Sequence, residues 1–237
     1  MGNTDSLPSF PDALGLTGET GPDPQSVCEQ LRTANGDAAL AGPCCQALWE
    51  MTVDPAYFSR LLECGAVEEV CRCSNRHPTD EAVQASACGF LAGVSIDPAG
   101  KQAVVQAGGL STVCSAMRRH TGNPDILREC CGALANVLQV KQHVGLAVDC
   151  GAAMLVCAAL EQHPAQLRLP RAAAGALHAI AATIGGCAAL VESRCSEALV
   201  PALRRQPQDR QLQGLGAATL RAVAQSSPAG LETAGQA

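Results

Sequence analysis

Cysteine and histidine are the residues of this chain whose types and spacing could do chemistry. The sequence has 14 cysteines and 5 histidines in 237 residues. The candidate groups are Cys44-Cys45, Cys71-Arg72-Cys73 and Cys130-Cys131, with His77 and His120 nearby. Paired thiolates with a neighbouring imidazole are typical of zinc sites and of redox dithiols. Either chemistry requires the groups to converge, which depends on the elements that hold them.

The chain repeats itself at intervals of 43 residues. Gly65, Gly108 and Gly151 fall in one column of this repeat, and a leucine column runs through Leu48, Leu91, Leu134, Leu177 and Leu220. Between the columns, apolar residues follow steps of three and four, which predicts helices. Asp97-Pro98, Gly108-Gly109 and Thr121-Gly122 predict the breaks between them. Each unit should therefore consist of a short, a medium and a long helix.

The repeat argues against a metal or redox centre. Most cysteines fall in its columns, as in Cys28, Cys71, Cys114 and Cys157 or Cys45, Cys88 and Cys131. Equivalent residues of stacked units lie about 8–10 Å apart, whereas zinc ligands lie about 2.0–2.3 Å from the ion. We therefore interpret these cysteines as small core residues and expect no metal site. Cys187 and Cys195 lie outside the columns considered and are expected to be exposed.

Histidines also recur, at 77, 120 and 163, with Gln206 in the next unit. Each lies at the expected end of a medium helix, where free carbonyl groups accept hydrogen bonds. We interpret them as helix caps. A pH-sensing or metal role is the alternative.

Composition excludes several classes of protein. The formal charge is −6, and lysine and arginine are scattered, which argues against nucleic-acid binding. We find no long apolar run typical of a membrane span and no secretory signal, so we expect a cytoplasmic protein with reduced thiols. The sequence also lacks a phosphate-binding glycine loop and a G-x-S-x-G motif, and we predict neither enzyme activity nor a cofactor.

Two segments of the clearest unit resemble the armadillo repeat: Val104-Val105-Gln106-Ala107-Gly108-Gly109-Leu110 and Cys131-Gly132-Ala133-Leu134-Ala135-Asn136-Val137. The chain is similar to armadillo-repeat-only proteins. The resemblance implies an all-α, right-handed superhelical solenoid of four to five repeats over residues 24–225. Residues 1–23 and 226–237 would be tails. The first copy would lack its first helix and the others would be complete.

In the armadillo family the long third helices line a concave groove that binds a partner protein. This resemblance implies a non-catalytic scaffold or adaptor that takes an extended segment or a helix. The candidate partner-binding residues are Gln46, Glu50, Arg128, Asn136, Arg171 and His178. We expect Arg128 and Arg171 to anchor an acidic segment, with Asn136 between them. The alternative is that these arginines only solvate a helix face. One copy keeps the asparagine and none keeps the tryptophan of nuclear-import adaptors, which argues against that mechanism.

The first residues, Met1-Gly2-Asn3-Thr4-Asp5-Ser6, fit the N-myristoylation pattern at Gly2. The first alternative function is therefore a lipid-anchored tether at an organelle surface, attached loosely through one acyl chain. The second is a thiol-based redox or metal-responsive protein. We expect a monomer in each case.

Overall fold

The computed structural model describes residues 23–34 and 36–226, and these form helices with no strand. The short first helices are α4 (Phe58–Glu63), α7 (Pro98–Gln106), α10 (Val144–Asp149) and α13 (Ile184–Glu192). The second helices are α2 (Pro24–Thr33), α5 (Ala66–Arg76), α8 (Gly109–Arg119), α11 (Ala152–Gln162) and α14 (Cys195–Arg205). The long third helices are α3 (Ala38–Met51), α6 (Glu81–Val94), α9 (Pro124–Val137), α12 (Leu169–Ile180) and α15 (Arg210–Ser226).

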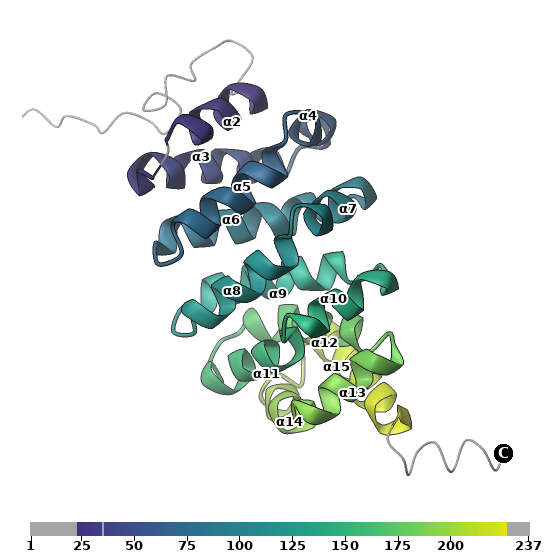
Figure 1. The fold of residues 1–237 in the computed structure, drawn as a ribbon. Helices are drawn as coiled ribbons and strands as arrows, with labels where there is room; N and C mark the ends of the chain where they lie inside the picture. Colours follow the sequence, from purple (N-terminus) through teal and green to yellow (C-terminus); the bar gives the residue numbers. More distant parts are fainter. Residues whose placement is uncertain (1–22, 35, 227–237) are drawn as a thin grey trace, which may run out of the picture.

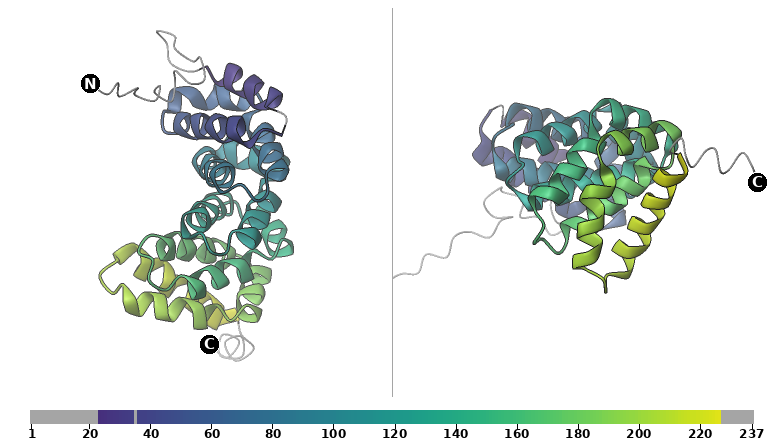
Figure 2. Two further views of the ribbon diagram at one scale, coloured as in Figure 1. Left: turned by 90° about the vertical axis from the view of Figure 1, so that its left-hand side faces the viewer. Right: turned by 90° about the horizontal axis from the view of Figure 1, so that it is seen from below.

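Equivalent helices stack on one another along an elongated, curved molecule (Figures 1 and 2). The long helices pack in the order α3, α6, α9, α12 and α15, and the second helices pack in the order α2, α5, α8, α11 and α14. One two-helix unit is followed by four three-helix units in the described part of the chain. The predicted all-α solenoid with a 43-residue period is confirmed.

Side-chain caps and left-handed residues set the helix boundaries. The side chains of Asp37, Asp80 and Asn123 accept hydrogen bonds from the first turns of α3, α6 and α9. Gly65, Gly108 and Gly151 have φ of 73°, 73° and 76° at the corners that precede the second helices. Arg194 occupies the same column with φ of 52°. The corner therefore keeps its left-handed geometry even where a side chain makes it costly.

Glycine also decides how the first helices begin. A Cβ atom on Gly100 would lie 1.9 Å from the Val94 oxygen, and one on Gly186 would lie 1.8 Å from the Ile180 oxygen. The two other copies have Tyr57 and His143 in this column. There the chain enters through the 3-10 turns η1 (Pro55–Tyr57) and η2 (Lys141–His143). Close contact with the preceding long helix thus requires glycine.

The core is one continuous layer of small aliphatic side chains and cysteines. The leucine column lies along it: Leu48, Leu91, Leu134 and Leu177 are fully buried, while Leu220 is half-buried. Leu220 lies on α15, the last helix of the described chain, which packs against α12 and no further long helix there. Each inner unit is thus stabilised by contacts on both sides.

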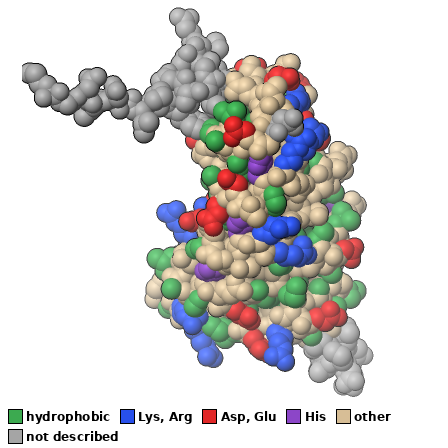
Figure 3. Space-filling model, turned by 60° about the vertical axis from the view of Figure 1, so that its left-hand side comes forward, with side chains coloured by type: hydrophobic (Ala, Val, Ile, Leu, Met, Phe, Trp, Pro, Cys, Tyr) green, Lys and Arg blue, Asp and Glu red, His purple; other side chains and the backbone are tan. Residues whose placement is uncertain are grey.

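The recurrent histidines link neighbouring units. His120 Nε2 donates to the Pro78 oxygen at 2.9 Å, and His163 Nε2 donates to the Thr121 oxygen at 2.6 Å. In the last unit, Gln206 Nε2 donates to the Gln166 oxygen at 3.0 Å. Histidine side chains lie in a line along one face (Figure 3). His77, His120 and His163 are the C-cap residues of α5, α8 and α11, as expected. The rings of His120 and His163 bind a carbonyl group one unit earlier rather than one of their own helix.

These links make a testable prediction. We expect His120→Ala to lower the free energy of unfolding by about 1 kcal/mol, because it removes one inter-unit hydrogen bond. His120→Gln should lose less, since Gln206 makes the equivalent bond in the last unit. Urea denaturation followed by circular dichroism measures both values. Equal losses for the two variants would contradict the role of the bond.

No single helix in the described ranges is long and apolar enough to span a membrane. One pair, Lys141–Asp149 with Ala152–Gln162, meets the criteria of length and composition only when joined across a bend of 73°. Both halves contribute to the protein core through Val144, Ala147 and Val156, which are fully buried.

Candidate functional site

Two adjoining hollows lie over the last three long helices. The first, of about 650 Å³, is lined by Arg128, Arg171 and Asp209 among others, and the second, of about 440 Å³, by Asn136 and His178. Both hollows share the lining residues Ala135, Gly175, Gln211 and Leu215. They therefore form one groove across α9, α12 and α15, which we call the C-terminal groove.

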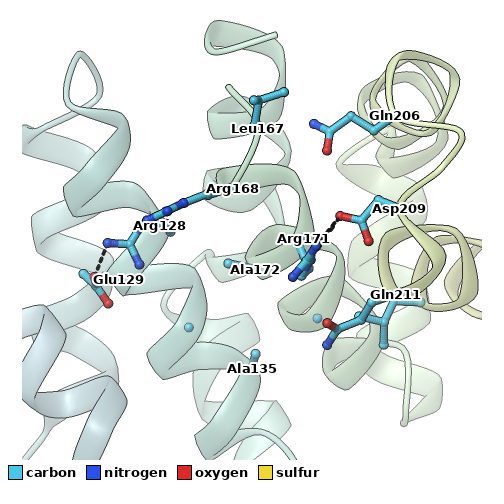
Figure 4. A pocket seen from close by; sticks show the side chains of 13 residues that line it. Arg128, Glu129, Ala135, Leu167, Arg168, Arg171, Ala172, Gln206, Asp209 and Gln211 are labelled. Carbon is cyan, nitrogen blue, oxygen red and sulfur yellow. Dashed lines mark hydrogen bonds and ion pairs between the residues drawn. The ribbon is translucent and has the colours of Figure 1, made fainter. Parts of the chain in front are cut away.

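Two arginines in the first hollow are paired with carboxylates of the same chain (Figure 4). Arg171 donates through Nε and Nη2 to Asp209 Oδ2 at 3.0 and 2.8 Å. The Leu212 amide and Arg171 donate to the Asp209 carboxylate and hold its pKa below the ordinary value. Nη1 of Arg171 does not bond to Asp209. Because the Arg171 side chain is 54% exposed and lines the hollow, its guanidinium can still bind a ligand there.

The second pair is more buried. Arg128 Nη2 forms an ion pair with Glu129 Oε1, while the side chain of Glu129 is 10% exposed. Burial raises the pKa of Glu129, and the charge of Arg128 opposes this change. Arg128 Nε is buried without a hydrogen bond, whereas Glu129 Oε1 is held by Arg128 Nη2. A buried polar group without a partner is costly, so Arg128 keeps one unused donor beside the ion pair.

A third guanidinium lies beside these pairs. Arg168, immediately before α12, is exposed and lines the first hollow. No ion pair to Arg168 occurs within residues 23–34 and 36–226. The hollow therefore holds three arginines against Glu129 and Asp209, and is net positive in a protein of net charge −6.

The groove brings together four of the six predicted binding residues. Arg128 and Arg171 line the first hollow, whereas Asn136 and His178 line the second. Asn136 therefore does not lie between the arginines, and its Nδ2 donates to the Ala92 oxygen at 2.9 Å. Part of its amide is already used within the chain.

The other two predicted residues, Gln46 and Glu50, lie on α3 and line neither hollow. Gln46 Nε2 donates to Glu50 Oε1 at 2.8 Å, and the Ser86 hydroxyl donates to Gln46 Oε1 at 3.1 Å. The first contact lies within α3, and the second joins α3 to α6. The structure thus separates Gln46 and Glu50 from the C-terminal groove.

Glycines in the long helices do not leave open space throughout the groove. A Cβ atom on Gly89 would lie 2.4 Å from the Trp49 ring, and one on Gly93 would lie 2.1 Å from Thr52 Oγ1. The space beside these two glycines of α6 is filled by Trp49 and Thr52 of the preceding unit, so it does not admit a partner side chain.

The described residues form no disulfide bond and contain no group of three or more His, Cys, Asp or Glu able to hold a metal ion. The expected exposure of Cys187 and Cys195 is wrong, since these residues are 5% and 1% exposed. Cys195 follows Ala66, Gly109 and Ala152 in a column of small buried residues, which could have been recognised from the sequence. Cys64 and Cys150 are the half-buried cysteines.

The sequence pattern did not predict some other residues of the groove. Asp209 shares a column with Asp37, Asp80 and Asn123, and like them it accepts a bond from the first turn of its long helix. The column predicts that Asp209 caps its helix, but it does not predict that Asp209 also forms an ion pair with Arg171. Arg168 and Leu167 lie in the turn before α12, where the repeat shows no pattern. Gly2 lies outside the described residues.

The fold and its groove define an α-solenoid built from stacked three-helix units. Residues 97–138 match the family model of the Armadillo/beta-catenin-like repeat, and this segment corresponds to one three-helix unit, α7 to α9. A search of curated proteins gave no significant match.

Solved structures give the same fold. One engineered protein of the Northeast Structural Genomics Consortium is 22% identical with a TM-score of 0.71, over 85% of this chain and 79% of the other. A second engineered protein is 20% identical with a TM-score of 0.71, over 84% and 47%. A chain from work on a conserved phosphorylation switch controlling the interaction between cadherin and beta-catenin is 16% identical with a TM-score of 0.53, over 97% and 53%. These likenesses concern the fold alone.

Proposed function

We propose that the protein is a non-catalytic scaffold that binds a segment of a partner protein along the C-terminal groove. The observation that carries this proposal is the continuity of two hollows, of about 650 and 440 Å³, along one face of α9, α12 and α15. A continuous groove fits an extended segment or a single helix better than a small compact ligand. The armadillo-type repeat is typical of protein-binding scaffolds, which supports the same assignment.

The charges of the first hollow favour an acidic segment. Arg168 is exposed without an ion pair in the described chain, and Arg171 presents an edge beyond its bond to Asp209. Guanidinium groups pair bidentately with carboxylates and phosphates. Ala172, Gly175 and Leu215 give the groove an apolar floor beside these charges. A segment with acidic and small apolar side chains matches both features.

Affinity capture followed by mass spectrometry identifies partners, and binding of a purified partner segment is then measured by calorimetry. We expect Arg168→Glu to weaken binding about 10-fold, because it places a negative charge where an acidic segment docks. Arg128→Glu with Arg171→Glu should weaken it further. Arg168→Glu is the cleaner variant, since Arg168 has no ion pair in the described chain to lose.

The matched control reverses the charge of Arg119 and Arg204, which are exposed on the second helices α8 and α14. This control should bind the segment like the unmodified protein. If the groove variants and the control bind with one affinity, the partner docks elsewhere and the proposal fails.

A further inference from the structure

Cysteine thiols meet in pairs across different helices. The Sγ atoms of Cys28 and Cys64 lie 3.3 Å apart, those of Cys88 and Cys130 lie 3.4 Å apart, and those of Cys45 and Cys73 lie 3.7 Å apart. A disulfide bond is about 2.05 Å long. These pairs are therefore reduced thiols in contact, with little movement required to join them.

Only the first of these three pairs reaches the surface. Cys88 and Cys130 are fully buried, and Cys45 and Cys73 are 0% and 5% exposed. Cys64, at the end of α4, is half-buried and lines a hollow of about 320 Å³ that is separate from the C-terminal groove. A small oxidant that enters this hollow can thus reach the Cys64 thiol, and the fully buried Cys28 thiol is in contact with Cys64.

Charged and polar groups around Cys64 favour its thiolate. Arg32 Nη2 donates to the Cys64 oxygen at 3.0 Å and holds the guanidinium beside the thiol. The hydrogen bond from Cys28, the Ala66 amide and the charge of Arg32 lower the pKa of Cys64 to about 7. Arg32 also forms an ion pair with Glu69 at 3.0 Å, which fixes its position. The Cys28 thiol keeps its proton, because burial and Cys64 raise its pKa.

We propose that Cys64 and Cys28 form an oxidative modification site, at which a hydroperoxide converts the two thiols into a disulfide between α4 and α2. The Cys64 thiolate attacks one peroxide oxygen, the O–O bond breaks, and hydroxide leaves with a proton as water. Cys28 sulfur then attacks Cys64 sulfur of the sulfenic acid. The S–O bond breaks, and the departing hydroxide takes the Cys28 proton as a second water. Two thiols are oxidised by two electrons and one hydroperoxide is reduced.

The same arrangement recurs two units later. Cys114, Arg118 and Cys150 each lie 86 residues after Cys28, Arg32 and Cys64. Arg118 donates to the Cys150 oxygen, and Cys150 is half-buried. Burial, and to a smaller extent Cys150, raises the pKa of the Cys114 thiol. The intervening unit has Asn75 and Ala107 in place of the arginine and the second cysteine. Cysteine, arginine and cysteine thus occur together at these positions twice along the chain.

The experiment uses the full chain treated with hydrogen peroxide at molar ratios near one, followed by alkylation of free thiols and mass spectrometry. We expect a mass loss of about 2 Da and a cross-link between the tryptic peptide containing Cys28 and residues 61–72. Fragment spectra assign the bond to Cys64 rather than to Cys71, which lies in the same peptide. Thiol reductant should restore the original mass.

The pair Cys88 and Cys130 is the internal control, because its sulfurs are equally close but buried. In Cys28→Ala, Cys64 should accumulate as a sulfenic acid trapped by a dimedone-type reagent, since no thiol lies behind it. Absence of the Cys28–Cys64 cross-link, or formation of the Cys88–Cys130 cross-link at the same rate, overturns the proposal. So does stepwise oxidation of Cys64 to a sulfonic acid in the unmodified protein. Circular dichroism confirms that each variant is folded.

Discussion

Gly186→Ala should lower the free energy of unfolding by about 3 kcal/mol, because the new Cβ atom collides with backbone rather than with a movable side chain. The position of that atom is 1.8 Å from the Ile180 oxygen and 2.8 Å from its carbonyl carbon. The two elements involved, α12 and α13, meet through buried residues on both sides, among them Ile180 and Leu190. Neither helix can move away without opening the core.

The neighbouring residue provides a matched control for this variant. Gly185 lies one position earlier in α13, and a Cβ atom there would meet nothing within 4 Å. Gly185→Ala should be neutral or should stabilise the protein by up to about 1 kcal/mol, because alanine favours helix more than glycine. Urea denaturation of both variants compares the same substitution in the same helical turn. Equal effects would show that the collision is relieved at low cost.

The other copies show how that relief would occur. Tyr57 and His143 occupy the column of Gly186, and the chain there enters the first helix through a 3-10 turn. Gly186→Ala would have to adopt this wider entry and draw Cys187 and Leu190 out of position. Gly100→Ala repeats the test two units earlier, where the new Cβ atom would lie 1.9 Å from the Val94 oxygen.

The sequence was most informative where the same requirement recurs in each unit. The leucine column and the left-handed glycines predicted the helices, because burial and backbone geometry act on every copy alike. The columns also predicted the burial of most of the cysteines within them, whereas Cys187 and Cys195, expected to be exposed, are buried as well. Individual contacts were less predictable. Trp49 fills the space beside Gly89, which depends on the size of one side chain in one copy.

The candidate site was predicted in part for the same reason. The repeat placed Arg128 and Arg171 on adjacent long helices, and both line the first hollow. Their carboxylate partners, Glu129 and Asp209, depend on side-chain rotamers, on which the periodic pattern carries no information. The pattern likewise does not indicate Arg168, which lies in the turn before α12 and lines the same hollow. Conversely, the separation of Gln46 and Glu50 from the groove reflects the distance along the stack, which a column comparison does not measure.

Leu134→Ala should cost about 4 kcal/mol, because Leu134 is fully buried between two neighbouring long helices and truncation leaves a cavity. Leu220→Ala, in the same column, should cost about 1–2 kcal/mol, since Leu220 is half-buried on the last helix. The stability of a solenoid is approximately the sum of its units and their interfaces. The helix of Leu134, α9, packs against both α6 and α12, whereas α15, the helix of Leu220, packs against α12 as its one long-helix neighbour in the described chain.

The comparison is made by chemical denaturation together with hydrogen exchange. Leu134→Ala should weaken the coupling between the two halves of the stack, so that amides of α12 and α15 exchange independently of those of α3 and α6. Leu220→Ala should affect α15 and its contacts locally. The two substitutions remove the same atoms, so their difference reports how many sides of a unit are covered. If both variants lost equal stability, α15 would be covered as fully as the inner helices, in contradiction to its single long-helix neighbour.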